Sequence, residues 1–173
     1  MRSGFIVLAF FTMIISSCNS SHDKPDRQRL PGKNEMADLN KYLVRKDKER
    51  IQNYIERKDL KMKETPSGLW YLIIREGTGE FLTDKDKIKM EYECYLLDGT
   101  KCYSSDELGP KEIMLGKTGI EPGLDQGLRM IKRGGEAMFI LPPFMAYGLP
   151  GDGKKIPSRA IIVYKVRIVN EQQ

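Results

Sequence analysis

The sequence predicts an α+β domain of about five antiparallel strands and one short helix, preceded by a charged N-terminal helix. Three observations lead to this fold class. Short runs rich in β-branched and aromatic residues are separated by Gly, Pro and Asp turn signals. The stretch 114–148 places apolar residues at helical spacing directly before an apolar strand. The segment 34–58 is charged and carries apolar residues mostly at helical spacing.

The composition excludes several classes of protein. Hydrophobic residues make up 40% and charged residues 31% of the 173 residues, which is typical of a soluble globular domain with extensions. The net charge of +5 is spread over the chain without a basic, aromatic stripe, so nucleic acid is not an expected partner. His22 stands alone and no nucleotide-binding or triad motif is present. We therefore expect no metal site and no cofactor.

The first 17 residues have the pattern of a signal peptide. Arg2 supplies the positive charge, and Gly4–Ile15 forms an apolar core shorter than the roughly 20 residues of a membrane-spanning helix. Small residues then precede Cys18, an arrangement that resembles the bacterial lipobox. This resemblance implies cleavage before Cys18 and attachment of lipid to it. The alternative is ordinary secretion, with Cys18 as an incidental thiol.

A lipidated Cys18 would anchor the protein in a membrane of the cell envelope. Residues 18–33 are polar and contain Pro and Gly, so they are expected to form a flexible tether. By the sorting rule of such lipoproteins, an aspartate directly after the lipidated cysteine would argue against the outer membrane. Residue 19 is asparagine, so the rule permits the outer membrane as the destination. The expected location is the outer membrane, facing the periplasm.

Residues 34–65 are expected to form a helical segment that Asn34 caps and that the Thr65–Gly68 turn ends. Its apolar stripe is narrow. The helix could therefore pack on its own domain or stand as a stalk in a monomer, or it could pair two chains in a homodimer. Residues 66–173 would form the folded domain.

Five strands are expected in this domain. The strand 136–141 is apolar on both faces, so both faces should be covered, and the nearly continuous β-branched final strand belongs in the centre of the sheet. The expected strands are Leu69–Arg75, Ile88–Leu97, Glu112–Leu115, Glu136–Leu141 and Ala160–Val169.

The Asp98-Gly99 pair predicts a tight hairpin that would pair Tyr95 with Cys102. In that register Cys94 and Cys102 point to opposite faces of the sheet, which disfavours a disulfide. A bulge or a three-residue loop would reverse this conclusion.

One short helix is expected after Pro122, whose restricted φ suits a helix start. Leu124, Leu128 and Ile131 recur on one helical face. Gly134-Gly135 can provide the C-terminal cap.

From Ser67 to Val169 the chain resembles the FKBP-type peptidyl-prolyl isomerases. The signatures are Tyr92 followed by the Asp98-Gly99 hairpin and Ser104-Ser105, then Leu115-Gly116, Pro122-Gly123, Ala146-Tyr147-Gly148 and Ile156-Pro157. Their order and spacing agree together. The resemblance implies an antiparallel sheet curled around one short helix, with an apolar pocket between them. The N-terminal segments also resemble envelope lipoproteins of this family, some of which are linked to gliding motility.

The resemblance also implies site residues and a partner. In the family pattern the Tyr147 hydroxyl and the backbone N–H of Glu121 hold a proline-containing polypeptide, and Tyr103 occupies a catalytic position. The matching pocket positions are Tyr92, Cys102, Ile120, Leu124 and Tyr164. The implied activity is peptidyl-prolyl cis-trans isomerisation that assists the folding of exported proteins. Tyr92 and Tyr164 could alternatively be core aromatics.

Four positions differ from the family pattern. Leu124 replaces a tryptophan, Cys102-Tyr103 replaces Phe-Asp, and Asp152 replaces a frequent histidine. These differences favour two alternatives to the isomerase. One is a non-catalytic module or chaperone that binds proline-containing or apolar segments in an envelope complex. The other is a structural assembly factor with a vestigial pocket.

Overall fold

The computed structural model describes residues 32–117 and 119–169. The expected signal peptide, Cys18 and all but the last two residues of the expected tether lie outside this range. None of the described helices has the length and apolar character needed to cross a membrane.

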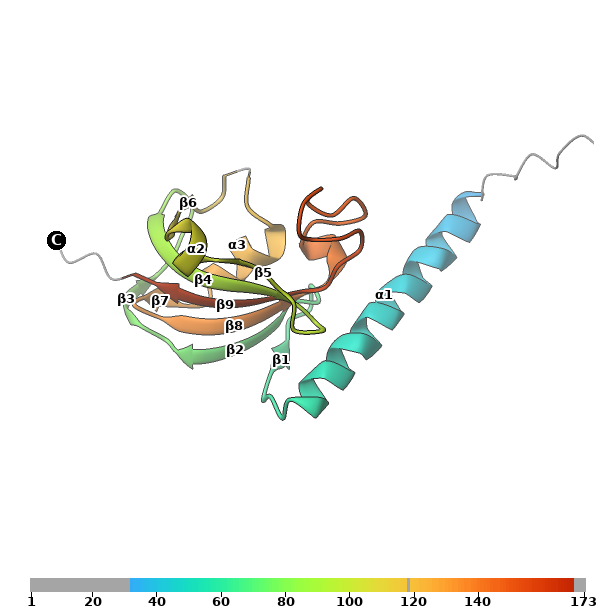
Figure 1. Cartoon of the computed structure of the whole chain (residues 1–173), viewed down its shortest axis with the longest axis horizontal. Helices are drawn as coiled ribbons and strands as arrows, with labels where there is room; N and C mark the ends of the chain where they lie inside the picture. The colour runs from blue at the N-terminus through green and yellow to red at the C-terminus, as the bar shows by residue number, and fades with distance from the viewer. Residues whose placement is uncertain (1–31, 118, 170–173) are drawn as a thin grey trace, which may run out of the picture.

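The domain is a curved antiparallel sheet with a short helix on its inner face and a long helix reaching one end of its outer face (Figure 1). The strand order in the main sheet is β1-β2-β8-β9-β4-β5, and β6 also pairs with β4. The strands are β1 (Lys63–Glu64), β2 (Trp70–Arg75), β4 (Lys87–Leu96), β5 (Lys101–Ser104), β6 (Lys111–Met114), β8 (Glu136–Leu141) and β9 (Ile162–Ile168). A separate pair joins β3 (Thr78–Phe81) to β7 (Lys132–Arg133). The helices are α1 (Lys33–Arg57), α2 (Ser105–Leu108), α3 (Pro122–Leu128) and the 3₁₀ turn η1 (Pro143–Met145).

The predicted central strands are confirmed. β9 lies between β8 and β4, and its alternate residues reach both covered faces. In β8, Phe139 joins the inner core beneath α3, whereas Ile140 joins a second cluster with Ile51 of α1. Both faces of β8 are therefore covered, as its two apolar faces predict. Trp70 packs beside this second cluster, in agreement with a packing role.

Two glycines let α3 lie unusually close to β8. A Cβ atom on Gly127 would be 2.9 Å from the Phe139 ring, and one on Gly123 would be 2.7 Å from Leu141. Leu124 and Leu128 of the same helix are fully buried. The helix therefore packs on the sheet through backbone on one side and through leucines on the other.

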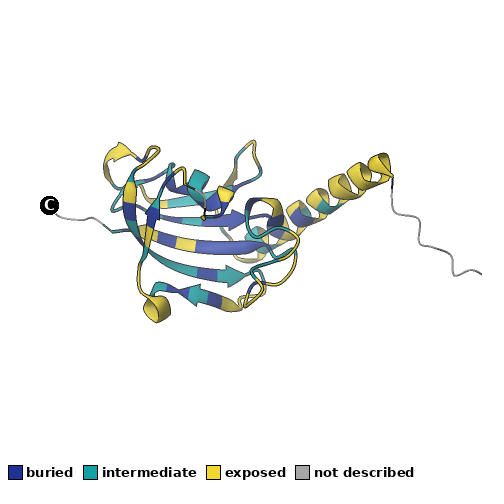
Figure 2. Ribbon diagram, turned by 90° about the horizontal axis from the view of Figure 1, so that it is seen from above, coloured by how far each residue is buried: buried dark blue, intermediate teal, exposed yellow. Residues whose placement is uncertain are grey.

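The long helix α1 contacts the domain only through its C-terminal half. Residues 33–42 are all exposed, whereas Asp47 and Ile51 are buried (Figure 2). Arg159, in the segment between β8 and β9, donates to Asp47 over 2.7 Å. The predicted cap at Asn34 is wrong: Gly32 is the N-cap, and its N–H donates to the Glu35 carboxylate over 2.8 Å.

The predicted pairing of Tyr95 with Cys102 is wrong. Tyr95 pairs with Lys101 and Cys94 with Tyr103, so Cys102 is an extra residue in β5. This bulge turns the Cys102 side chain into the core, where Cys94 also lies, and both thiols are free. The expectation that the two cysteines point to opposite faces fails for the same reason.

One local prediction also differs from the structure. Gly134-Gly135 do not cap the short helix, because α3 ends at Leu128 and β7 intervenes. These glycines instead form the tight turn from β7 to β8, where Gly134 has a φ of 73°.

Substituting Gly127 with Ala is expected to destabilise the fold by about 1–3 kcal/mol, because the new methyl group would overlap the buried Phe139 ring. In an open helix the same change would add roughly 0.5–1 kcal/mol of stability. Urea denaturation measures the difference. Gly32→Ala, at the open N-cap of α1, meets no close neighbour and is the control; it should cost at most about 1 kcal/mol, because alanine is a poorer N-cap than glycine. A Gly127→Ala protein as stable as the wild type would contradict the close contact.

Neither Cys94 nor Cys102 should react with iodoacetamide in the folded protein at pH 8. Burial raises the pKa of the Cys94 thiol to about 12, and burial also raises that of Cys102. Both should label fully in denaturant, as peptide mapping by mass spectrometry can measure. Rapid labelling of Cys102 alone in the folded state would support the unbulged register instead.

Candidate functional site

Most of the residues predicted to form the site belong to, or pack against, the core cluster on the inner face of the sheet. In Figure 1 this face is the one that α3 and the segment from β8 to β9 lie over. Glu121, Leu124, Cys102 and Tyr164 are buried at the base of the site, with Cys94 beside them. Tyr92, Tyr103, Ile120 and Tyr147 are partly exposed around its rim. They are supplied by β4 (Tyr92, Cys94), β5 (Cys102, Tyr103), the loop before α3 (Ile120, Glu121), α3 itself (Leu124), the loop after η1 (Tyr147) and β9 (Tyr164).

Glu121 brings a carboxylate to the base of this site. Its side chain is buried with 6% exposure. The Tyr164 hydroxyl donates to Oε1 over 2.8 Å, and this bond lies in the interior. The other oxygen, Oε2, is buried without a well-aligned partner among the described residues, and the Tyr147 hydroxyl is the donor that lies beside the same side chain. The base of the site is therefore polar, whereas the family resemblance implies an apolar pocket.

Two hydroxyl groups and one thiol around Glu121 are held in their neutral forms. Burial, followed by the Glu121 carboxylate, raises the pKa of the Tyr164 hydroxyl. Burial, followed by a hydrogen bond to the Glu121 side chain and by its charge, raises the pKa of the Tyr147 hydroxyl, and burial chiefly raises that of Cys94. These groups stay protonated at neutral pH, so each can act as a donor.

The Tyr103 hydroxyl is already engaged. It donates to the Asp152 carboxylate, and this bond raises the pKa of the tyrosine. Asp152 also accepts the backbone N–H groups of Lys154 and Ile156, each over 2.8 Å. Partial burial opposes the charge on Asp152, but these hydrogen bonds outweigh it and lower its pKa. Tyr103 thus ties β5 to the loop opposite it and is not a free donor.

Tyr92 and Tyr164 lie side by side at one wall. Their ring centroids are 6.4 Å apart and the rings are tilted by 57°. The backbone N–H of Tyr92 donates to the Ser105 hydroxyl over 3.1 Å, which links β4 to the start of α2. Tyr164 is buried in the core, whereas Tyr92 is partly exposed.

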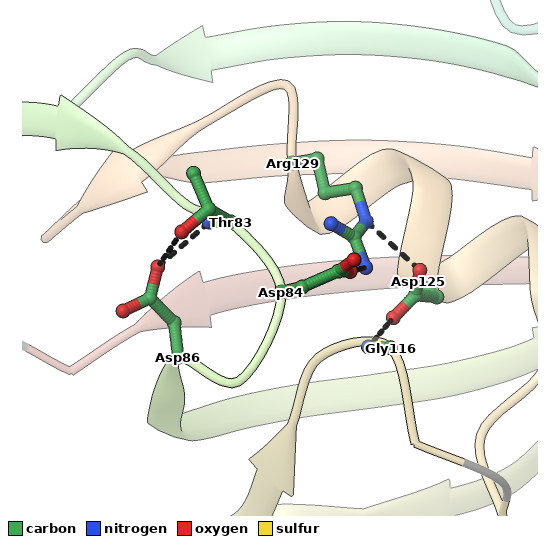
Figure 3. A network of polar contacts seen from close by, with 6 residues as sticks. All are labelled: Thr83, Asp84, Asp86, Gly116, Asp125 and Arg129. Carbon is green, nitrogen blue, oxygen red and sulfur yellow. Dashed lines mark hydrogen bonds and ion pairs between the residues drawn. The ribbon is translucent and has the colours of Figure 1, made fainter.

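A polar network positions the loop that carries Ile120 and Glu121 (Figure 3). Asp125 of α3 accepts the backbone N–H of Gly116 and the Arg129 side chain, both over 2.9 Å. Arg129 also pairs with Asp84 over 2.7 Å, so the β3–β4 turn is connected to the same helix. The loop from Gly116 to Glu121 is therefore anchored at its start to α3, which it enters at Pro122.

Sequence reasoning missed two features of the site. One is the Glu121 side chain, for which only the backbone N–H was considered. The other is Asp152, which was noted as a substitution and not as the partner of Tyr103. A glutamate placed directly before a helix-starting proline, among apolar residues, was the available signal for the first. No three His, Cys, Asp or Glu side chains in the described ranges form a group that could hold a metal ion.

Comparisons with known proteins agree with this arrangement. The family model for FKBP-type peptidyl-prolyl cis-trans isomerases matches residues 78–169. A probable FkpA isomerase of Neisseria meningitidis is 36% identical over 62% of this chain and 39% of its own length. FkpA of Escherichia coli K12 is 31% identical over 72% of this chain and 45% of its own length. The chain therefore spans less than half the length of these relatives.

Two solved structures share the fold. The crystal structure of FkpA from Escherichia coli superposes with a TM-score of 0.64 and 28% identity, over 79% of this chain and 63% of that chain. The crystal structure of AtFKBP13 superposes with a TM-score of 0.60 and 25% identity, over 65% of this chain and 99% of that chain. With the sheet, the central helix and the family match in agreement, the chain belongs to the FKBP-type peptidyl-prolyl cis-trans isomerase family.

Proposed function

We propose that this protein is a peptidyl-prolyl cis-trans isomerase that assists the folding of exported proteins. The observation that carries the proposal is that Tyr92, Glu121 and Tyr147 all lie against Tyr164, on the inner core that also contains Leu124. These residues come from separate parts of the chain and match the family's pocket positions. Relatives that match this part of the chain bear the name of this isomerase.

Rotation about an X-Pro bond forms and breaks no covalent bond, so binding of the twisted amide can be enough to speed it. The barrier is about 18–20 kcal/mol, because the amide loses resonance as it twists. The twisted amide is less polar than the planar one, so apolar surroundings favour it over the ground state. Ile120 and Leu124 would provide such surroundings, and the Tyr147 hydroxyl would hold the peptide through a carbonyl oxygen. No nucleophile is required.

A second candidate is a module or chaperone that binds proline-containing segments without isomerising them. The Tyr103–Asp152 bond favours it, because the hydroxyl at the expected catalytic position is occupied. Suppression of client aggregation, without acceleration of proline isomerisation, would support this candidate.

A third candidate is a structural assembly factor that does not use the site. It would be supported if a Tyr92→Ala, Tyr147→Ala double variant retained full function in the cell.

We also propose that the protein is anchored to the cell envelope through lipid on Cys18, facing the periplasm from the outer membrane. The signal-peptide pattern and the position of Cys18 support this.

The oligomeric state is a separate proposal, with a monomer and a homodimer as the two candidates. Met36 and Leu39 are exposed on the N-terminal part of α1, which does not contact the domain, and this favours pairing of two α1 helices. Sedimentation velocity separates the two states.

Replacing Tyr147 with Phe should lower kcat/KM by about two- to tenfold in a protease-coupled assay on a proline tetrapeptide. The reason is the loss of one hydrogen bond worth roughly 0.5–1.5 kcal/mol. Tyr95→Phe is the matched control, because its hydroxyl bonds to Glu93 outside the site. Equal activity of the Tyr147→Phe and wild-type proteins would remove Tyr147 from the mechanism. A wild-type protein without turnover would defeat the isomerase proposal.

Replacing Cys18 with Ser should abolish incorporation of a labelled fatty acid and release the protein from the membrane fraction. The thioether and the amide that carry lipid both require Cys18 at the mature N-terminus, and multiple acyl chains provide the anchoring energy, about 0.8 kcal/mol per buried methylene. Cys94→Ser should keep both the label and the membrane association. Labelled Cys18→Ser protein would show that the anchor lies elsewhere.

A further inference from the structure

The loop 148–159 borders the proposed substrate site. It directly follows Tyr147 and contains no helix or strand. Its residues 153–155 are exposed, whereas Ile156 is buried in the core cluster that also holds Leu124. Exposed loops of this kind move readily unless specific contacts fix them. The contacts that fix this loop therefore decide how that side of the site is shaped before a peptide arrives.

Asp152 organises the tip of the loop. One of its carboxylate oxygens accepts the backbone N–H groups of Lys154 and Ile156, each over 2.8 Å. The backbone N–H of Asp152 in turn donates to the Ile156 carbonyl oxygen over 3.1 Å. Gly151 beside it has a φ of 71°, and a Cβ atom there would be 2.3 Å from the same carbonyl oxygen. The turn 151–156 is therefore one compact unit built around Asp152.

Tyr103 connects this turn to β5. Its hydroxyl donates to the other carboxylate oxygen of Asp152. The Cys102 thiol next to it lies 3.6 Å from the carbonyl oxygen of Lys155. The Lys155 ammonium lies 5.4 Å from the centroid of the Tyr103 ring and faces Glu107 of α2 at 3.6 Å, but this ion pair is exposed and contributes little. The hydrogen bond from Tyr103 to a charged acceptor is therefore the main link between the loop and β5.

We propose that Tyr103 and Asp152 are positioning residues that hold the loop 148–159 ready for a proline-containing segment. This inference rests on the isomerase function proposed above. Tyr103 has one hydroxyl proton and Asp152 accepts it, so Tyr103 acts on the peptide through the loop and not as a donor to it. A loop that is already ordered loses less conformational entropy when a peptide binds. The pair should therefore affect KM more than kcat.

The first experiment measures KM and kcat of Tyr103→Phe, Asp152→Asn and the double variant on a proline tetrapeptide in the protease-coupled assay. Asp152→Asn keeps one oxygen for the two backbone N–H groups and loses the charged acceptor of Tyr103. Each single variant should raise KM about three- to tenfold and change kcat less than about twofold. The double variant should be no worse than Tyr103→Phe, because both changes act on one bond. Tyr95→Phe, whose hydroxyl bonds to Glu93, is the matched control and should keep the wild-type KM.

The second experiment measures amide hydrogen exchange by NMR and does not depend on turnover. The backbone N–H groups of Lys154 and Ile156 bond to Asp152, so their exchange reports how firmly the turn is held. We expect these two groups to exchange about three- to tenfold faster in Tyr103→Phe than in the wild-type protein. Tyr95→Phe should leave their exchange unchanged.

Three results would overturn the inference. One is a wild-type KM in Tyr103→Phe, because a bond that serves stability alone would lower the urea midpoint and leave KM unchanged. Another is a higher kcat/KM in Asp152→Asn than in the wild type, which would make the Tyr103 hydroxyl a donor to the peptide. The third is unchanged amide exchange in Tyr103→Phe.

The outcome separates this inference from the proposed activity. If the wild-type protein does not isomerise the peptide, the isomerase proposal fails, and the calorimetric Kd of the same peptide replaces KM in the same comparison of variants. A Kd that rises about three- to tenfold in Tyr103→Phe would then still support the positioning role. A wild-type protein with neither turnover nor peptide binding would overturn both.

Discussion

The close packing of α3 on β8 is the contact on which the proposed site depends. Gly127 lies against the Phe139 ring with no room for a methyl group, so the helix axis can approach the sheet only at this glycine face. The approach buries Leu124 at the base of the site. It also sets where the chain enters the helix, and so where Glu121 meets Tyr164 of β9. A helix held farther from the sheet would separate the two.

The long helix and the site share one segment of the chain. Residues 142–161 carry Tyr147 and Asp152 to the rim, and near their end Arg159 pairs with Asp47 of α1. Burial raises the pKa of Asp47, while the nearby Arg159 and Arg50 favour its charged form. The pair therefore connects the outer helix to the loop that completes the site.

Periodicity alone predicted the parts of this fold that depend on burial. The central position of β9, the two covered faces of β8 and the leucine face of α3 follow from which residues are apolar. The register of the β4–β5 hairpin did not follow, because a bulge of one residue at Cys102 reverses the direction of its side chain without changing the pattern of hydrophobicity. The Glu121–Tyr164 pair joins residues 43 apart, and only the folded sheet brings them together.

The polar base of the site limits how the proline bond could be rotated. A twisted amide is favoured by surroundings less polar than water, and the buried Glu121 side chain does not provide them. The partly exposed Ile120 side chain and the Tyr147 hydroxyl are then the groups that would favour rotation of any proline segment that reaches them.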